Sequence, residues 1–359
     1  MTPATATPSA PSARADAPVR PRRSGGRTVG FGVGVAAVLL LLSVRLFAPA
    51  ETGEALSDGV RDGITLAISV VIESLPFVFL GIVLSIAVQL FLPADFLMRR
   101  LPRTPWVRRA VVSLFGVLLP VCECGNVPLA RGLMLRGLSV GESMTFLLAA
   151  PILNPVTIVV TYQAFGWEDG ILAWRIAGGF LVANLVGWLF SRHADPMRLL
   201  TPGFQATCAH AADEQAARAG GREGARAKGR RAVRMFADET SAMLPALMVG
   251  SAVAGAIQIA VSRDVLVAVG QDAVWSVVAL MLLAFVISIC SNVDAFFALA
   301  FSSTFLPGAI IAFLVFGPMI DIKMLALMRT TFTARTLVQV TAVVALASAA
   351  IGLGVNAFA

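Results

Sequence analysis

The residues best suited to chemistry lie in one short stretch, Leu119–Pro128, which reads LPVCECGNVP. It holds the thiols of Cys122 and Cys124, the carboxylate of Glu123 and the amide of Asn126, between two prolines. Thiols are ligands for soft, polarisable species, and a carboxylate can orient a ligand or carry a proton. The stretch therefore predicts a binding site for a small soft solute.

Apolar sequence flanks this stretch on both sides, over residues 110–119 and 129–138. Proline and glycine at these positions would break a helix. A broken helix at membrane depth is tolerated only where protein or a water-filled cavity surrounds the freed backbone groups. The stretch is therefore the leading candidate for a transport site.

The composition requires a membrane. Hydrophobic residues make up 57% of the 359 residues and the mean hydropathy is +0.83. Several segments exceed the roughly 18 apolar residues that are typical of a membrane-spanning helix. The net charge of +7 would suggest nucleic acid in a soluble protein. Here the arginines fall in loops and tails, so retention on the cytoplasmic side and a lipid bilayer partner explain them, without nucleic acid.

These features predict an all-α polytopic protein of the cytoplasmic membrane with a cytoplasmic N-terminus. The expected order is a disordered cytoplasmic tail (1–28), an N-terminal transmembrane anchor (29–48), a first permease repeat (60–190), a basic cytoplasmic linker (191–236) and a second permease repeat (237–357).

The two repeats are recognised by short motifs that recur in the same order. Leu75-Pro76 returns 169 positions later as Leu244-Pro245. Cys124-Gly125-Asn126-Val127 returns 166 positions later as Cys290-Ser291-Asn292-Val293, and Pro151-Ile152-Leu153-Asn154 returns 167 positions later as Pro318-Met319-Ile320-Asp321. Near-constant offsets indicate a duplicated unit. Gly81 and its counterpart Gly250 are expected to let helices approach closely.

Each repeat is expected to contribute about three spans and one re-entrant hairpin. The hairpins are expected around residues 110–138 and 274–306, and the spans that follow them over residues 144–162 and 310–328. A hairpin keeps Arg131 and Arg136 on the cytoplasmic side. The odd number of crossings then places the repeats in opposite orientations, the inverted plan of many secondary transporters. The alternative is a fourth full span in each repeat, which makes the two copies parallel.

Five ionisable residues fall inside apolar segments, where each costs about 2.5–3.5 kcal/mol on insertion scales. They are Glu73, Glu123, Asp294, Asp321 and Lys323. Glu123 and Asp294, which lie at the breaks, and Asp321 are expected to bind substrate or carry a coupling proton. Glu73 and Lys323 are assigned either to coupling or to pairing between helices. The alternative for the whole set is structural pairing, for example of Asp321 with Lys323 or Arg175.

Cys290 would add a third thiol to the site. The alternative is that the cysteines are small buried hydrophobes. Asn126, Asn154 and Asn292 are expected to line the site, or else to cap half-helices and satisfy backbone groups freed by the nearby prolines. No cofactor and no resident metal are expected, although the three thiols could hold a soft metalloid as cargo.

With these motifs the chain resembles the predicted-permease family that includes ArsP and YraQ, over residues 60–355. The resemblance rests on Pro120–Leu129 (PVCECGNVPL) followed by Ala150–Pro155 (APILNP). It implies a permease, and ArsP-type members are efflux permeases for trivalent organoarsenicals. Cys122 and Cys124 match the family's Cys-x-Cys, whereas Glu123 and Asn126 stand where YraQ-like members frequently carry small polar residues.

The resulting hypothesis is a secondary permease, not an enzyme, that exports a small thiophilic solute, with proton coupling as a further element. A homo-oligomer is compatible with it. One rival is a membrane thiol or redox enzyme that uses Cys122 and Cys124. Another is a structural subunit of a larger permease complex that docks through the basic linker.

Overall fold

The computed structural model describes residues 58–92, 99–118, 121–167, 169–218, 224–260 and 272–358. The tail and the N-terminal anchor predicted over residues 1–48 lie outside these ranges. Within them the chain is an all-α polytopic membrane protein. Four helices are long and apolar enough to cross a membrane: α2 (Asp58–Phe91), α9 (Ile171–Ser191), α11 (Ala225–Ala260) and α17 (Ala334–Phe358).

Shorter helices fill the space between these four. The first half contributes α4 (Pro105–Ser113), α5 (Phe115–Leu118), α6 (Glu123–Leu135), α7 (Val140–Ala149) and α8 (Pro155–Phe165), and the second half contributes α13 (Trp275–Ile287), α14 (Asp294–Leu299), α15 (Pro307–Phe316) and α16 (Ile322–Met328). The linker forms a 3-10 turn, η2 (Pro196–Leu199), and α10 (Pro202–Arg218).

The centre of the molecule is built on α7, which is buried along its whole length, and α15, which is buried from Gly308 to its end. A helix that is surrounded on every side can be apolar all round, as these two are, apart from the polar first turn of α7. That turn is held by a capping box in which Ser139 and Glu142 bond each other's backbone N–H groups. Around this centre α7 packs on α9 and α15 packs on α17.

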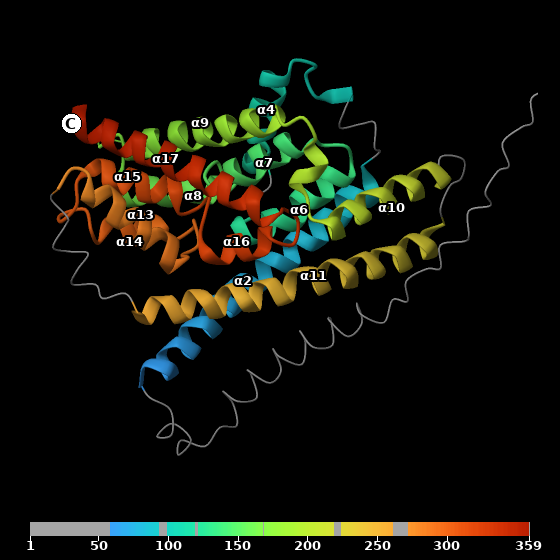
Figure 1. Cartoon of the computed structure of the whole chain (residues 1–359), viewed down its shortest axis with the longest axis horizontal. Helices are drawn as coiled ribbons and strands as arrows, with labels where there is room; N and C mark the ends of the chain where they lie inside the picture. The colour runs from blue at the N-terminus through green and yellow to red at the C-terminus, as the bar shows by residue number, and fades with distance from the viewer. Residues whose placement is uncertain are drawn as a thin grey trace, which may run out of the picture.

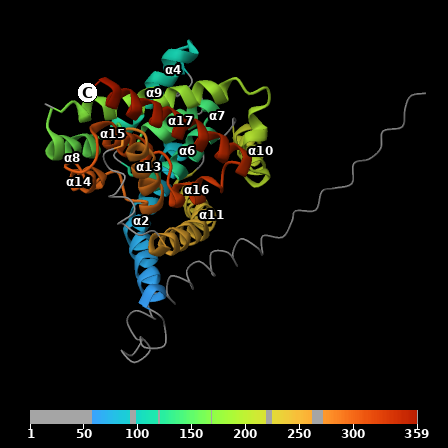
Figure 2. The same ribbon diagram turned by 60° about the vertical axis from the view of Figure 1, so that its left-hand side comes forward.

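The long helices α2 and α11 lie together on one side of the molecule, opposite α9 and α17 (Figures 1 and 2). They contact each other extensively, and α2 also packs on α6 while α11 packs on α16. Each contains a proline, Pro76 or Pro245, that does not end the helix. Neighbouring helices can satisfy the backbone carbonyl that such a proline leaves free.

Gly81 of α2 supports the expectation of close helix approach. A methyl group at this position would lie only 2.6 Å from the Cα atom of Gly125 in α6. Side chains larger than hydrogen would therefore push α2 away from the first turn of α6. Gly250 has the same function in α11, where an added Cβ would lie 3.2 Å from the Cα atom of Lys323.

Two spans that the sequence presents as continuous are divided in the structure. The segment expected to cross over residues 144–162 consists of α7 and α8, which are separated around Pro151–Asn154. The segment expected over residues 310–328 consists of α15 and α16, which are separated around Gly317–Asp321. The cause is local, because Asn154 and Asp321 each start a new helix as its N-cap.

Part of the linker also differs from the solvated connector that the sequence suggests. Leu199, Leu200 and Phe204 are buried in the core, and α10 packs against α6. The second half of the linker continues directly into α11, whose helix begins at Ala225.

Candidate functional site

Two chain breaks, one in each half, have the same local design. Before α6, Cys122 has an extended backbone (φ −71°, ψ 172°) and acts as the N-cap, so that the helix begins at Glu123. Its carbonyl accepts hydrogen bonds from the N–H groups of Gly125 and Asn126, at 3.1 and 3.2 Å. Before α14, the carbonyl of Cys290 accepts from Val293 and Asp294 at 3.0 and 3.2 Å. Both halves therefore contain a backbone bend with the same hydrogen-bond pattern, which starts at Cys122, two residues before the motif residue Cys124, in the first half and at the motif residue Cys290 in the second.

The second break begins where α13 ends. Ser288 has a left-handed backbone (φ 53°), a conformation that costs a non-glycine residue roughly 1–2 kcal/mol. This bend turns the Ser288 carbonyl toward α16, where it accepts a hydrogen bond from Lys323 Nζ at 3.3 Å. The strained residue thus belongs to the polar centre.

Glu123 is the middle of this centre. One carboxylate oxygen forms an ion pair with Lys323 Nζ at 3.3 Å. The other accepts from the Ser291 hydroxyl at 3.2 Å, from the Ser291 N–H at 3.4 Å and from the Cys290 thiol at 3.6 Å. The side chains of Glu123 and Lys323 are only 2% and 1% exposed. A carboxylate of the first half is therefore held by four groups of the second half, which belong to three residues.

Three thiols gather at the same place. The ligand atoms of Cys122, Glu123 and Cys290 all lie within 4.8 Å of one another. The Cys122 thiol also interacts with that of Cys124, and all three cysteines are free and buried. The two chain breaks thus meet face to face and place two sulfurs and one carboxylate around a single point, which we call the thiol–carboxylate cluster.

Asn154 and Asp321 stand beside the cluster as equivalent caps. Asn154 Oδ1 accepts from the Val156 N–H at 2.9 Å, while its Nδ2 donates to the Val121 carbonyl at 3.3 Å. Asp321 Oδ1 accepts from the Met324 N–H, and its Oδ2 is buried without a hydrogen-bond partner among the described residues. Helix capping, one of the two alternatives for Asn154, is therefore present in both halves.

The other two asparagines differ from each other. Asn126 is fully buried, yet neither atom of its amide has a hydrogen-bond partner in the described structure. Buried amides are nearly always paired, so such an atom calls for a ligand or water. Asn292 is half-buried and accepts from the Thr157 hydroxyl of α8 at 3.4 Å.

Asp294 belongs to a second polar centre. It pairs with Arg175 of α9 at 2.6 Å, and Arg175 also donates to the Thr161 hydroxyl of α8 at 2.7 Å. The Arg175 and Asp294 side chains are 1% and 3% exposed. The sequence suggests that Asp321 pairs with Lys323 or with Arg175. In the structure Lys323 forms its ion pair with Glu123, and Arg175 forms its ion pair with Asp294. Sequence reasoning does not assign a site role to three of these residues, Arg175, Ser291 and Thr161. A lone arginine in the apolar run 171–190 nevertheless indicates a functional or paired position for Arg175.

Glu73 does not join either centre. Its side chain is exposed on α2, and no described residue forms an ion pair with it. The structure therefore separates Glu73 from the remaining predicted site residues.

Known proteins are similar to this chain over most of its length. Residues 61–357 match the family model ArsP_1, described as a predicted permease. The UPF0718 protein YcgR of Bacillus subtilis is 36% identical over 76% of this chain and 89% of its own length. A putative two-component membrane permease complex subunit of Streptococcus mutans is 30% identical over 79% of this chain and 91% of its own length.

A shorter match covers the UPF0718 protein YraQ of Escherichia coli, which is 29% identical over 32% of each chain. No solved structure matches this chain.

Proposed function

Because this chain belongs to the ArsP_1 family of predicted permeases, and so is a membrane permease, we propose that its thiol–carboxylate cluster is the substrate site. The substrate class would be a small thiophilic solute such as a trivalent organoarsenical, and the direction would be export. The single observation that carries the proposal is the meeting of Cys122, Glu123 and Cys290 within 4.8 Å of one another at two helix breaks.

The chemistry of the cluster suits such a solute. A trivalent arsenical with two hydroxyl groups reacts with two thiols to form two As–S bonds. Each thiol proton leaves with one hydroxyl as water, so charge and oxidation state are unchanged. Soft sulfur ligands favour this partner over hard cations such as Mg²⁺. The free amide of Asn126, eight-tenths of a turn beyond Glu123 on α6, would bind a polar group of the solute.

Coupling to protons would use the Glu123–Lys323 pair. A proton bound by Glu123 removes the negative charge that holds the Lys323 ammonium and the Ser291 N–H. The buried ammonium would then have to move toward another acceptor, and Asp321 is the nearby carboxylate that acts on it electrostatically. This rearrangement links a proton to a change in the position of α16.

The alternation of access would come from the two halves acting as inverted repeats. Equivalent elements support this: α7 and α15 are the buried centre, α9 and α17 cover them, and Asn154 and Asp321 cap equivalent half-helices. The basic linker would lie in the cytoplasm with the N-terminus, and the chain in the cytoplasmic membrane.

The test is uptake of phenylarsine oxide by everted membrane vesicles. We expect Cys122→Ser with Cys124→Ser, and separately Cys290→Ser, to reduce uptake at least tenfold. Cys208→Ser is the matched control, because this thiol lies in α10 outside the cluster. Unchanged uptake in both cluster variants would remove the cysteines from the mechanism.

Proton coupling has a separate test. Glu123→Gln should abolish the dependence of uptake on an imposed pH gradient, because an amide cannot exchange the proton. Uptake that keeps its normal pH dependence in this variant would exclude Glu123 as the carrier.

A second candidate function is suggested by the Streptococcus mutans relative, which is named as a subunit of a two-component complex. In that case this chain would need a second protein for transport. Purified chain in liposomes distinguishes the two: uptake of phenylarsine oxide without another protein supports the self-sufficient permease, and uptake only after addition of a membrane extract supports the complex.

A further inference from the structure

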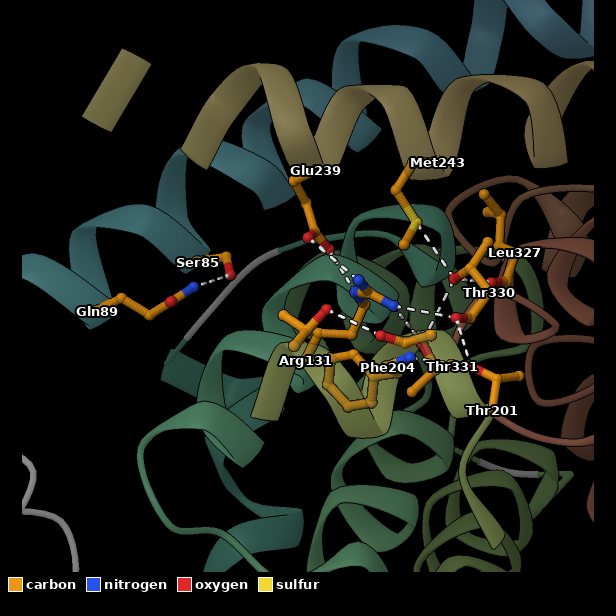
Figure 3. A network of polar contacts seen from close by, with 12 residues as sticks. Ser85, Gln89, Arg131, Thr201, Phe204, Glu239, Met243, Leu327, Thr330 and Thr331 are labelled. Atoms are coloured by element: carbon orange, nitrogen blue, oxygen red, sulfur yellow. Dashed lines mark hydrogen bonds and ion pairs between the residues drawn. The ribbon is translucent and has the colours of Figure 1, made fainter. Parts of the chain in front are cut away.

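A third polar network surrounds the buried Arg131, and the proposed transport mechanism does not use it. Arg131 Nε donates to Glu239 of α11 at 2.6 Å, and another of its nitrogens lies 3.4 Å from the second Glu239 oxygen. The third nitrogen donates to the Thr330 carbonyl at 3.2 Å and to the Thr331 hydroxyl at 3.1 Å. The guanidinium also lies 4.3 Å from the ring centroid of Phe204. We call these five residues the Arg131 clamp (Figure 3).

The clamp joins all three parts of the chain. Arg131 comes from α6 of the first half, Glu239 from α11 at the start of the second half, and Phe204 from α10 of the linker. Thr330 and Thr331 follow α16 near the end of the second half. One side chain therefore holds together segments that are separated by up to 200 positions in the sequence.

The linker is fixed to the same turn by backbone hydrogen bonds. The Thr201 N–H donates to the Thr331 carbonyl at 2.8 Å, and the Thr333 N–H donates to the Leu199 carbonyl at 3.0 Å. Between them Leu200 and Phe332 form an antiparallel bridge. Movement of the turn after α16 must therefore move the linker or break these bonds.

The two helices that hold the clamp are also the two that carry the Glu123–Lys323 pair. On α6, Glu123 is the first residue and Arg131 follows about 12 Å further along the helix. On α16, Lys323 lies in the first turn, and Thr330 comes two residues after the helix ends at Met328. One end of this helix pair thus holds the cluster, and the other end holds the clamp.

We propose that the Arg131 clamp is the cytoplasmic gate of the permease, closed in this structure, and that α6 and α16 connect it to the thiol–carboxylate cluster. This rests on the proposed function. A solute that replaces the contact between Glu123 and Lys323 lets α6 and α16 separate, and their separation breaks the contacts of Arg131. The cluster then opens toward the side of the membrane on which the linker lies.

The experiment measures how fast a membrane-impermeant maleimide modifies the cluster thiols, using the full chain with Cys208→Ser in membrane vesicles of either orientation. In everted vesicles we expect Glu239→Gln to increase the modification rate at least tenfold, because it removes the ion pair and retains the threonine contacts. In right-side-out vesicles the rate should not change. No change in everted vesicles, or an equal increase from both sides, would overturn the proposal, since a merely structural contact loosens the protein without direction.

Arg131→Ala should give the same one-sided increase with a larger magnitude. Glu239→Gln keeps the question answerable if the Arg131 variant does not fold. The matched control is Arg198→Met, which removes an exposed arginine that pairs with Asp195 on the surface of the linker. Its modification rates should equal those of the parent chain.

Thiol modification requires no knowledge of the substrate, so the two proposals fail separately. A one-sided increase with no phenylarsine oxide transport would uphold the gate and reject the substrate class. Cysteine-dependent transport with no increase in modification would uphold the substrate class and reject the gate.

Discussion

Two fully buried ion pairs of this permease, Glu123 with Lys323 and Asp294 with Arg175, have the same plan and different surroundings. In each pair the carboxylate is the first residue of a short helix that follows a chain break, Glu123 in α6 and Asp294 in α14. The cation comes from the opposite half, Lys323 in α16 for the first pair and Arg175 in α9 for the second. Both pairs therefore fasten one half of the molecule to the other.

The difference lies in the cation and in the contacts of each carboxylate, because both oxygens of Glu123 have partners whereas Asp294 Oδ1 has none in the described structure. Asp294 binds a planar guanidinium at 2.6 Å, and the same guanidinium is fixed by Thr161. Glu123 binds an ammonium at 3.3 Å and accepts contacts of 3.2 Å from the Ser291 hydroxyl and 3.6 Å from the Cys290 thiol. A guanidinium forms a rigid fork, whereas an ammonium is a compact charge on a flexible chain. The Asp294 pair is suited to a fixed joint and the Glu123 pair to exchange of partners.

The largest predicted effect is on stability, and it follows from breaking the ion pair between Asp294 and Arg175. Arg175→Met should lower the free energy of unfolding by about 3–5 kcal/mol, because it leaves an uncompensated buried carboxylate. Thermal unfolding in detergent measures this. Combining Arg175→Met with Asp294→Leu removes both charges and should recover most of the loss. If the double variant is as unstable as the single one, the pair is not a joint of this kind.

A smaller effect on stability, with a larger effect on transport, is predicted at the other pair. Glu123→Gln should cost about 1.5–3 kcal/mol of unfolding free energy, because it weakens charged hydrogen bonds but keeps the shape of the side chain. Phenylarsine oxide uptake in everted vesicles should fall at least tenfold. The contrary result is uptake that is retained in Glu123→Gln and lost in the double variant Asp294→Leu, Arg175→Met. It would mean that the Asp294 pair exchanges partners during transport and that the Glu123 pair is the fixed joint.

A change in helix packing provides a third test of whether the Glu123 centre and the Asp294 centre respond independently. Gly81→Ala should destabilise the protein by about 1–3 kcal/mol, since the new methyl group overlaps the backbone of Gly125 beside Glu123. Gly203→Ala is the control, because an added Cβ there meets nothing within 4 Å. Amide hydrogen exchange should increase in the first turn of α6 and not in α14. Increased exchange in both helices would mean that the two centres respond as one unit.

The smallest effect is predicted at the equivalent caps. Asp321→Asn should change the unfolding free energy by less than about 0.5 kcal/mol, because asparagine caps a helix as well as aspartate does. Transport should nevertheless slow, since the buried Asp321 Oδ2 has no partner in the described structure and is the acceptor we assign to Lys323. Equal transport rates for Asp321→Asn and the parent chain would restrict Asp321 to capping.

The first chain break could be predicted from the sequence, because proline and glycine in an apolar run interrupt a helix. The second break contains neither residue, and only its likeness to the first motif indicated it. The repeated motif at Cys124 and Cys290 also indicated which breaks correspond. The ion pairs could not be predicted, since Glu123 and Lys323 are 200 positions apart and their contact depends on how the halves pack. Arg131 was treated only as a marker of the cytoplasmic side, although it is buried among four partners.

The divided spans show the same limit. The run from Met144 to Tyr162 is apolar enough to be taken as one helix, but Pro151, Pro155 and the N-cap Asn154 interrupt it locally. The Asn154 side chain also donates a hydrogen bond to the Val121 carbonyl. That bond connects two segments that the sequence presents as independent.

The most direct test of the central claim is to identify the thiols that one arsenical molecule bridges. Phenylarsine oxide is added to the purified Cys208→Ser chain in detergent, and mass spectrometry of the protease digest locates the bridge. The account predicts one molecule per chain, joining the peptide of Cys122 to the peptide of Cys290. A bridge confined to Cys122 and Cys124, or the absence of any bridge, would contradict the meeting of the two chain breaks at a single site.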